Sequence, residues 1–408
     1  MKKPIIFSTL LMLVLFFLSF SYAFALKPFN TDAILEHTGV ESEKIENEYI
    51  GGLKINGATF ERVYSGSINS GDITVTNKEE LLRALKEVKR GQSIFIAGDA
   101  RIDLTGENKI TVPHGVTLCS DRGRDGSPGA LLYTDLHGVS PLFRANGNGV
   151  KFAGLRIEGP DTAVYYNITN RTKSVDPINL DRIKKLNDYD AKKDALPRST
   201  GVSIEGAGVE IYNCELYGWT NAAIQVSPSA RNTVIRHNHI HHNQHFGLGY
   251  GVLLYKSTAL IKANLFDYNN HSVTGSGHQG TGFEIVNNIF KENHVRAWAV
   301  DMHGGTDRKD GTDLAGDSFV VRNNDFYLHF GRPGINIRGI PASESTISNN
   351  KFVYLADDDN INRYQNRRKQ LGVGVQVDRS GTNLNSKTAI RFKGRRVVSK
   401  NNEVQTRK

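Results

Sequence analysis

The chain has 408 residues, with 51 Lys and Arg against 42 Asp and Glu, and a formal net charge of +9. Its two cysteines are too few for a disulfide scaffold, so the fold must depend on a hydrophobic core. No RNA-recognition, helix-turn-helix or zinc-finger pattern is present, which argues against a nucleic-acid partner. The excess of positive charge favours an anionic partner instead.

Residues 1–25 are predicted to be a signal peptide. Lys2 and Lys3 precede an apolar run over residues 4–20, and small residues at 23 and 25 form a cleavage site. Cleavage removes both lysines, so (51 − 2) − 42 leaves a net charge of +7. No later stretch approaches the ~20 apolar residues of a membrane span. We therefore expect a monomeric protein without stable membrane insertion that is secreted, periplasmic or on the cell surface.

Residues 26–70 show no clear period and are interpreted as an N-terminal lead-in. A strand is predicted over 72–76, followed by an amphipathic helix over 77–88. Either Thr76 or Asn77 has the spacing of a helix cap with a glutamate three residues later. Such a helix would cover the open end of a repeat domain.

One sequence pattern recurs seven times between residues 209 and 404: a hydrophobic pair, Asn or a substitute, one further residue and a large apolar side chain. The closing apolar residues are 24, 26, 24, 36, 26 and 52 positions apart and are Leu216, Ile240, Phe266, Phe290, Phe326, Phe352 and Val404. A fixed period of this size indicates a solenoid, and apolar residues that alternate within short segments indicate strands.

We therefore predict an all-β fold, a single parallel β-helix over residues 71–408. The recurring asparagines would stack in one inward column, in which Cys214 replaces Asn: Asn238, Asn264, Asn288, Asn324 and Asn350. Loop excursions are expected at the turns between strands, where they can wall one side of a binding face. They lie near residues 161–200, 304–317, 355–371 and 379–395.

The interior of a parallel β-helix is filled with side chains, so function must lie on outward strand positions and flanking loops. In the second strand of each coil the inward residues align as Val226, Leu254, Met302, Ile337 and Val377. The preceding outward residues are Gln225, Leu253, Asp301, Asn336 and Gln376. The following residues are Ser227, Tyr255, His303, Arg338 and Asp378, and we place His278 beside Tyr255 and His303.

This strip supplies the candidate site. The candidate catalytic residues are His303, His278, Arg338, Lys256 and Tyr255. The candidate substrate-binding residues are Asp301, Asn336, His245, Tyr250, Arg296 and Arg332. The histidines of the 237–242 stretch are interpreted as exposed turn residues rather than zinc ligands: His237, His239, His241 and His242.

A calcium site is the possible cofactor site, with Asp301 and Asp307 as ligands. Both belong to a Gly-rich stretch over 301–317 that carries five carboxylates, and oxygen ligands on a flexible backbone suit Ca²⁺. The spacing does not match an EF-hand, and a solvated acidic loop is the alternative.

The Asn-containing coils, the helical cap and the signal peptide resemble the secreted right-handed parallel β-helix proteins of the pectate-lyase-like superfamily. The resemblance covers most of the mature chain and implies a right-handed coil. It does not specify the reaction, because the superfamily includes polysaccharide lyases, epimerases, glycosidases and binding proteins.

The residues favour a lyase that cleaves an acidic, uronate-containing polysaccharide by β-elimination. Arg338 or a bound Ca²⁺ would neutralise the uronate carboxylate and stabilise the enolate. His278, His303 or Lys256 would remove the C5 proton, and Tyr255 would protonate the leaving oxygen.

Three other functions stay open. A non-enzymatic cell-surface or glycan-binding solenoid would use the same basic and aromatic face. A uronate epimerase begins with the same proton abstraction. A polygalacturonase-like hydrolase is less favoured, because residues 277–280 match only one motif of that family. An inverting hydrolase also needs two carboxylates about 6.5–9.5 Å apart, and only Asp301 is central.

Overall fold

The computed structural model describes residues 49–51, 53–56, 59–61, 70–162, 197–245, 247–293, 298–329, 334–355, 389–392 and 396–407. The predicted signal peptide lies outside these residues, as do most of the excursions near 161–200 and 355–371. None of the helices in the described part of the chain has the length and apolar character needed to cross a membrane.

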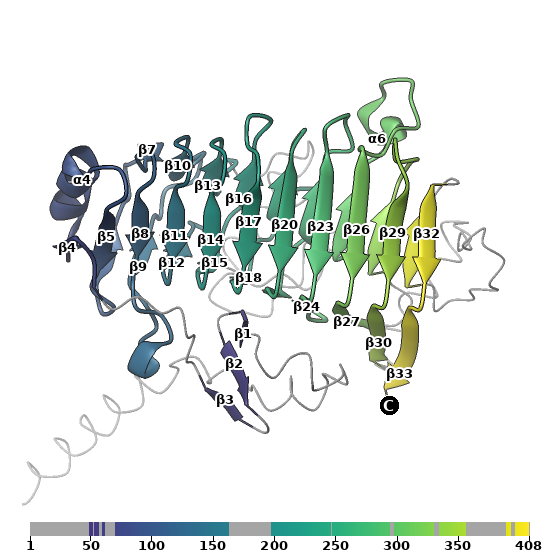
Figure 1. The fold of residues 1–408 in the computed structure, drawn as a ribbon, viewed down its shortest axis with the longest axis horizontal. Helices are drawn as coiled ribbons and strands as arrows, with labels where there is room; N and C mark the ends of the chain where they lie inside the picture. The colour runs from purple at the N-terminus through teal and green to yellow at the C-terminus, as the bar shows by residue number, and fades with distance from the viewer. Residues whose placement is uncertain are drawn as a thin grey trace, which may run out of the picture.

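Three parallel sheets enclose the core of the described chain (Figure 1). Sheet 1 contains β4 (Ile73–Val75), β5 (Ser93–Ile96), β8 (Thr117–Cys119), β11 (Lys151–Ala153), β14 (Glu210–Tyr212), β17 (Thr233–Arg236), β20 (Thr258–Lys262), β23 (Gly282–Val286), β26 (Ser318–Arg322), β29 (Ser345–Ser348) and β32 (Val397–Lys400). Sheet 2 contains β6 (Arg101–Asp103), β9 (Leu131–Tyr133), β12 (Arg156–Glu158), β15 (Glu215–Tyr217), β18 (His239–His241), β21 (Leu265–Asp267), β24 (Ile289–Phe290), β27 (Asp325–His329), β30 (Lys351–Leu355) and β33 (Glu403–Arg407). Sheet 3 contains β7 (Ile110–Thr111), β10 (Phe143–Ala145), β13 (Thr200–Ile204), β16 (Ala222–Val226), β19 (Tyr250–Leu254), β22 (His271–Gly275), β25 (Val300–Met302), β28 (Ile335–Ile337) and β31 (Ile390–Phe392).

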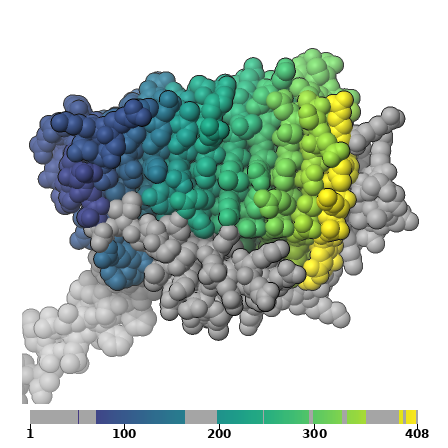
Figure 2. Space-filling view, in the orientation of Figure 1, coloured from purple at the N-terminus to yellow at the C-terminus, as the bar shows by residue number. Residues whose placement is uncertain are grey.

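Each complete coil passes from a strand of sheet 3 to one of sheet 1 and then one of sheet 2, and each strand pairs in parallel with its counterparts in the neighbouring coils. The coils follow one another in chain order along the molecule, as the steady change of colour in Figure 2 shows. The predicted parallel β-helix is therefore confirmed.

The predicted capping helix is α4 (Lys78–Glu87), at the start of the stack (Figure 1). Asn77 is its N-cap, because its side chain accepts a hydrogen bond from the Glu80 backbone N–H at 3.0 Å. The Glu80 carboxylate accepts in return from the Thr76 backbone N–H at 2.8 Å. Leu81 and Leu85 are buried against the first coil, so the helix closes the apolar end of the core.

Part of the lead-in forms a small antiparallel sheet, β1 (Tyr49–Ile50), β2 (Leu53–Asn56) and β3 (Thr59–Glu61). Its first turn contacts the β-helix, because the Gly51 backbone N–H donates to the Ala263 carbonyl at 3.0 Å. The Arg122 guanidinium donates to the Gly51 carbonyl, also at 3.0 Å.

The predicted asparagine column is confirmed at the corner between sheets 1 and 2. Its five members are at most 1% exposed. Between successive asparagines the amide oxygen accepts from the backbone N–H and side-chain amide of the preceding rung, as when Asn288 accepts from Asn264 at 2.8 and 3.0 Å. The Asn264 amide also donates to the Ile235 carbonyl at 2.9 Å. The column therefore satisfies buried polar groups while it fixes neighbouring coils in register.

The sharp corner requires a left-handed residue, and this is the residue before the ladder position. Its φ lies between 53° and 56° at Asn213, His237, Ala263, Asn287, Asn323, Asn349 and Asn401. Asparagine tolerates this conformation better than most residues, which accounts for the recurring Asn-Asn pair. Cys214 occupies a ladder position as a buried free thiol, as predicted.

Two boundaries in the last coils differ from the prediction. The excursion predicted near 379–395 contains strand β31, and Phe392 rather than Val377 pairs with Ile337. The prediction failed because the segment around Val377 also has the composition of a strand, and it lies outside the described residues.

A stack of phenylalanine rings fills part of the interior of the β-helix. The centroids of successive rings are 4.9, 4.5 and 4.7 Å apart in the order Phe266, Phe290, Phe326 and Phe352.

The ladder predicts a position-dependent loss of stability. Asn288→Ala should lower the free energy of unfolding by about 3 kcal/mol, because several buried partners lose their hydrogen bonds. Asn402→Ala is the matched control, since this last rung is partly exposed. Urea denaturation measures both losses, and equal losses would contradict a ladder in which each interior rung holds two neighbours.

Candidate functional site

The candidate site lies on the outward face of sheet 3, toward the C-terminal coils. The strand register pairs Thr274 with Asp301 and Asp301 with Asn336. The inward residues Leu254, Met302 and Ile337 align as predicted, with Gly275 in the intervening coil. Side chains from successive coils therefore point the same way at the ~4.8 Å strand spacing.

Asp301 is the anchor of this face, although it is fully buried. Its carboxylate accepts two hydrogen bonds from Arg338, at 2.9 Å from Nε and 2.5 Å from Nη2. It accepts a third from the Asn336 amide at 2.9 Å. His303 Nε2 lies 3.3 Å from its Oδ2. One buried carboxylate thus positions an imidazole and a guanidinium beside each other.

The protonation states follow from burial and these contacts. Burial alone would raise the pKa of Asp301, but its basic neighbours His271, Arg338 and His303 outweigh burial and hold that pKa below the usual value. Arg338 is the dependable cation among them, because guanidinium stays protonated in proteins. Burial lowers the pKa of His303, and the carboxylates of Asp301 and Asp307 only partly oppose this effect. At neutral pH His303 is therefore a neutral imidazole that can accept a proton.

Asp307 reaches the same face from the 304–317 excursion, in the short helix α6 (Gly305–Arg308) (Figure 1). Its Oδ1 accepts from Arg338 Nη1 at 3.0 Å, and its Oδ2 lies 3.9 Å from His303 Nδ1. The turn after β22 packs closely against the start of this excursion at Gly277. Gly277 has φ +69°, and a Cβ on it would lie 1.8 Å from the His303 carbonyl oxygen.

An aromatic row runs across the neighbouring coils to this cluster. The rings of Tyr250 and His271 stack with centroids 5.9 Å apart, and those of His271 and Trp298 with centroids 5.7 Å apart. The Arg338 guanidinium lies 4.8 Å from the Trp298 ring. The sequence interpretation missed Trp298, although it stands two residues before Val300 just as His271 stands two residues before Val273.

Two buried polar atoms beside the cluster have no hydrogen-bond partner among the described residues. They are Trp298 Nε1 and Thr274 Oγ1. Thr274 precedes Asp301 in the outward column. These two unpaired atoms depart from the usual pattern, in which buried polar groups are hydrogen-bonded.

A second group lies on the same side of the molecule around Tyr255, which is 41% exposed. Lys256 Nζ is 5.7 Å from the Tyr255 ring centroid, and the His278 ring centroid is 5.4 Å from it. Burial and the charges of Arg308 and Lys256 lower the pKa of His278.

The predicted strand position of His278 was wrong, although its predicted proximity to Tyr255 was correct. Leu254 pairs with Gly275, so Ser276, not His278, occupies the column between Tyr255 and His303. The turn after β22 nevertheless brings the His278 ring to Tyr255.

The remaining predicted residues fall elsewhere. His245 is buried and forms an isolated bridge with Leu248. The Tyr250 hydroxyl donates to the Gly247 carbonyl at 2.9 Å, which leaves its ring for stacking. Arg296 and Arg332 lie outside the described residues.

The carboxylates of the 301–317 stretch do not fit a calcium site in this arrangement. Asp301 and Asp307 both bind Arg338, which places a cation between them. Asp310 accepts from Arg308, and Asp317 from the Gly280 backbone N–H. Calcium needs six to eight oxygen ligands, whereas the carboxylates of Asp301, Asp307, Asp310 and Asp317 each already accept a hydrogen bond from the protein.

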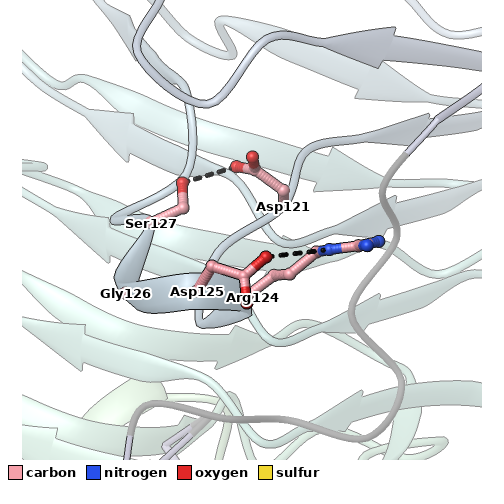
Figure 3. Close-up of a pocket in the computed structure, with 5 residues that line it drawn as sticks. All are labelled: Asp121, Arg124, Asp125, Gly126 and Ser127. Atoms are coloured by element: carbon pink, nitrogen blue, oxygen red, sulfur yellow. Dashed lines mark hydrogen bonds and ion pairs between the residues drawn. The ribbon is translucent and has the colours of Figure 1, made fainter.

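A separate hollow lies on the loop between β8 and β9, around the turn η1 (Arg124–Gly126) (Figure 3). Ser127 donates to Asp121 at 2.6 Å, and Arg124 pairs with Asp125 at 3.4 Å. These groups satisfy each other, and none belongs to the sheet 3 cluster.

The comparisons with known proteins agree with this architecture. Residues 144–326 match the family described as the right handed beta helix region. The fold of the described residues is that of a right-handed parallel β-helix. A search of curated proteins finds no match.

Several solved structures are similar to the chain at low identity. An alginate lyase from Paenibacillus sp. str. FPU-7 is 13% identical, with a TM-score of 0.48, over 82% of this chain and 97% of that one. A family 28 exopolygalacturonase of Yersinia enterocolitica is 12% identical, with a TM-score of 0.41, over 84% and 64%. A surface protein and adhesin of Streptococcus pneumoniae is 12% identical, with a TM-score of 0.38, over 83% and 96%.

His271 predicts how stability depends on pH. Burial lowers its pKa to about 4, against 6.5 for an exposed histidine. The unfolded chain therefore binds a proton at a pH where the folded chain does not, so this contribution is present above about pH 6.5 and is lost as the pH falls toward 4. The loss amounts to about 3 kcal/mol.

His271→Gln should flatten the dependence of the unfolding free energy on pH across this interval, relative to the wild-type protein. Denaturant unfolding at several pH values measures both slopes. An unchanged slope in His271→Gln would show that folding does not shift the pKa of His271, and would contradict the effect of burial.

Proposed function

We propose that this protein is a lyase that cleaves an acidic, uronate-containing polysaccharide by β-elimination on the outward face of sheet 3. The observation that supports this is the cluster in which buried Asp301 holds neutral His303 and cationic Arg338 together. A base beside an anion-binding group is what proton abstraction next to a carboxylate requires.

Arg338 would bind the uronate carboxylate. Three of its N–H groups bond to Asp301 and Asp307. A guanidinium has five N–H donors, so two remain for a ligand. These donors would also stabilise the negative charge that develops on the carboxylate as the C5 proton leaves. Because this cation is fixed in place, the proposal requires no Ca²⁺.

His303 would remove the C5 proton through Nδ1. Its Nε2 faces Asp301 at 3.3 Å, which orients the ring with the proton on Nε2 and the lone pair on Nδ1. The two carboxylates on either side stabilise the imidazolium once it forms. The electron pair of the broken C5–H bond forms the C4–C5 double bond, and the C4–O bond breaks.

The leaving oxygen needs a proton, and the strand register limits which side chain is near enough to donate it. Tyr255 is two strands from His303, roughly 10 Å at the usual strand spacing. We therefore assign return of the proton to His303 itself, in a syn elimination. Tyr255, Lys256 and His278 would then contact a neighbouring sugar of the chain.

The geometry disfavours a glycoside hydrolase. Such an enzyme needs one carboxylic acid that is protonated at the working pH. Asp301 is instead ionised, because its basic neighbours His271, Arg338 and His303 lower its pKa, and Asp307 pairs with Arg338. A uronate epimerase shares the first step, and its saturated product distinguishes it from a lyase.

The direct test is turnover on a panel of uronate polysaccharides, followed by the ultraviolet absorbance of the unsaturated product with and without a chelator. We expect turnover that the chelator does not abolish. His303→Gln should lower it ~10²-fold or more, and the distant His114→Gln should not change it. Arg338 is a poorer probe, because its removal leaves the buried Asp301 charge without its partner.

Absence of unsaturated product from every uronate polymer would refute the lyase proposal. Epimerised or merely bound polymer would then identify the alternative. Full activity in His303→Gln would remove His303 from the mechanism even if the polymer is cleaved.

Binding should also depend on salt. An acidic polysaccharide attracted to Arg338 and Lys256 should bind more weakly as salt rises, because screening acts beyond a Debye length of ~8 Å at physiological ionic strength. Titration calorimetry with a polyuronate at two salt concentrations measures this effect, with a neutral glucan as the control. Equal, salt-independent binding of both polymers would contradict an anionic partner.

A further inference from the structure

A second cluster of chemically active side chains lies on the outward face of sheet 2, away from the proposed lyase site. The register pairs Glu215 of β15 with His239 of β18, and Tyr217 with His241. His239 and His241 alternate along one strand, so both side chains face outward toward Glu215. Their interpretation as exposed turn residues is wrong, because His241 is 8% exposed and the His239 side chain 13%.

The ligand atoms are close enough to share one metal ion. Glu215 Oε1 lies 3.0 Å from His241 Nε2 and 3.7 Å from His239 Nδ1. The three ligand atoms lie within 4.8 Å of one another. Tetrahedral zinc with bonds of about 2.0–2.2 Å separates its ligands by about 3.4 Å, which lies between the 3.0 and 3.7 Å contacts of Glu215.

The surroundings hold the imidazoles in place. His241 Nδ1 is 2.6 Å from His242 Nδ1, which fixes the ring while Nε2 faces Glu215. The His241 ring also stacks on Tyr217 at 4.8 Å, and the Tyr217 hydroxyl donates to Glu158 at 2.7 Å. Support of this kind around a ligating histidine is typical of metal sites.

We propose that Glu215, His239 and His241 bind one divalent transition-metal ion, with zinc as the expected metal. Two imidazoles and one carboxylate suit zinc and its neighbours rather than calcium or magnesium, which prefer oxygen. Three protein ligands leave a fourth position for water. This site is independent of the uronate site, which lies on sheet 3.

The nearby charges are mixed. Arg122 acts on Glu215 and His239 and opposes a cation. Its guanidinium, however, donates to the Gly51 carbonyl and to the Asn213 side chain. Asp267 pairs with His241 in register on the next coil and adds a carboxylate nearby. The metal would cross-link β15 and β18 close to the point where the β1–β2 turn meets the β-helix.

The test uses the full chain stripped of metal by a chelator and then titrated with Zn²⁺. We expect one bound zinc per chain, a higher thermal midpoint with zinc, and no such rise with Ca²⁺ or Mg²⁺. Co²⁺ in place of zinc should give the visible absorption of a tetrahedral site.

Glu215→Gln and His239→Gln should each weaken zinc binding by about 100-fold or more, and His114→Gln should leave it unchanged. Circular dichroism shows whether each variant is folded. If His239→Gln does not fold, the isosteric Glu215→Gln variant still tests the proposal. Equal zinc affinity in wild type and both ligand variants would show an adventitious ion only and overturn the proposal. None of these zinc measurements depends on turnover. The zinc proposal can therefore be tested even if the lyase proposal fails.

Discussion

The asparagine ladder is the interaction on which the rest of the structure depends. Each rung bonds to the next through both its backbone and its side chain, inside a core that excludes water. A coil shifted by one residue would leave these buried amides unpaired, and the inward side chains of its strands would face outward. The ladder therefore fixes one register for all three sheets. Loops can then vary in length without moving the strands that flank them.

The candidate site is a consequence of that register. Asp301, Asn336 and Thr274 come from three coils, yet they lie in one column because the ladder aligns their strands. The inward neighbours Met302 and Ile337 keep the backbone in place. A buried carboxylate on such a rigid face can hold His303 and Arg338 without a mobile element. The excursion that carries Asp307 adds a second anion from the side.

The sequence predicted the repeated architecture well, because a period in strand-length segments has few physical solutions. The ladder asparagines, the capping helix and the inward residues from Val226 to Ile337 follow directly from it. Position along an irregular turn was harder to predict. His278 lies two residues beyond its expected place, because the Gly-rich turn after β22 has no apolar residue to mark the inward position.

Contacts between side chains were not predictable from spacing alone. Spacing placed Asp301 on the outward face, yet it gave no sign that the carboxylate is fully buried. Trp298 was missed because the sequence alignment of this coil considered only the residues next to the inward Met302, which are Asp301 and His303. The histidines of β18 read as a polar turn, since burial of an outward face by segments distant in sequence leaves no local signal.

The most direct test of the proposed chemistry is a crystal structure of the His303→Gln variant with a uronate oligosaccharide bound. The account predicts a uronate carboxylate against Arg338, with the C5 hydrogen of the same sugar directed at the side chain of residue 303. An oligosaccharide that binds away from sheet 3, or that presents only neutral hydroxyls to Arg338, would contradict it.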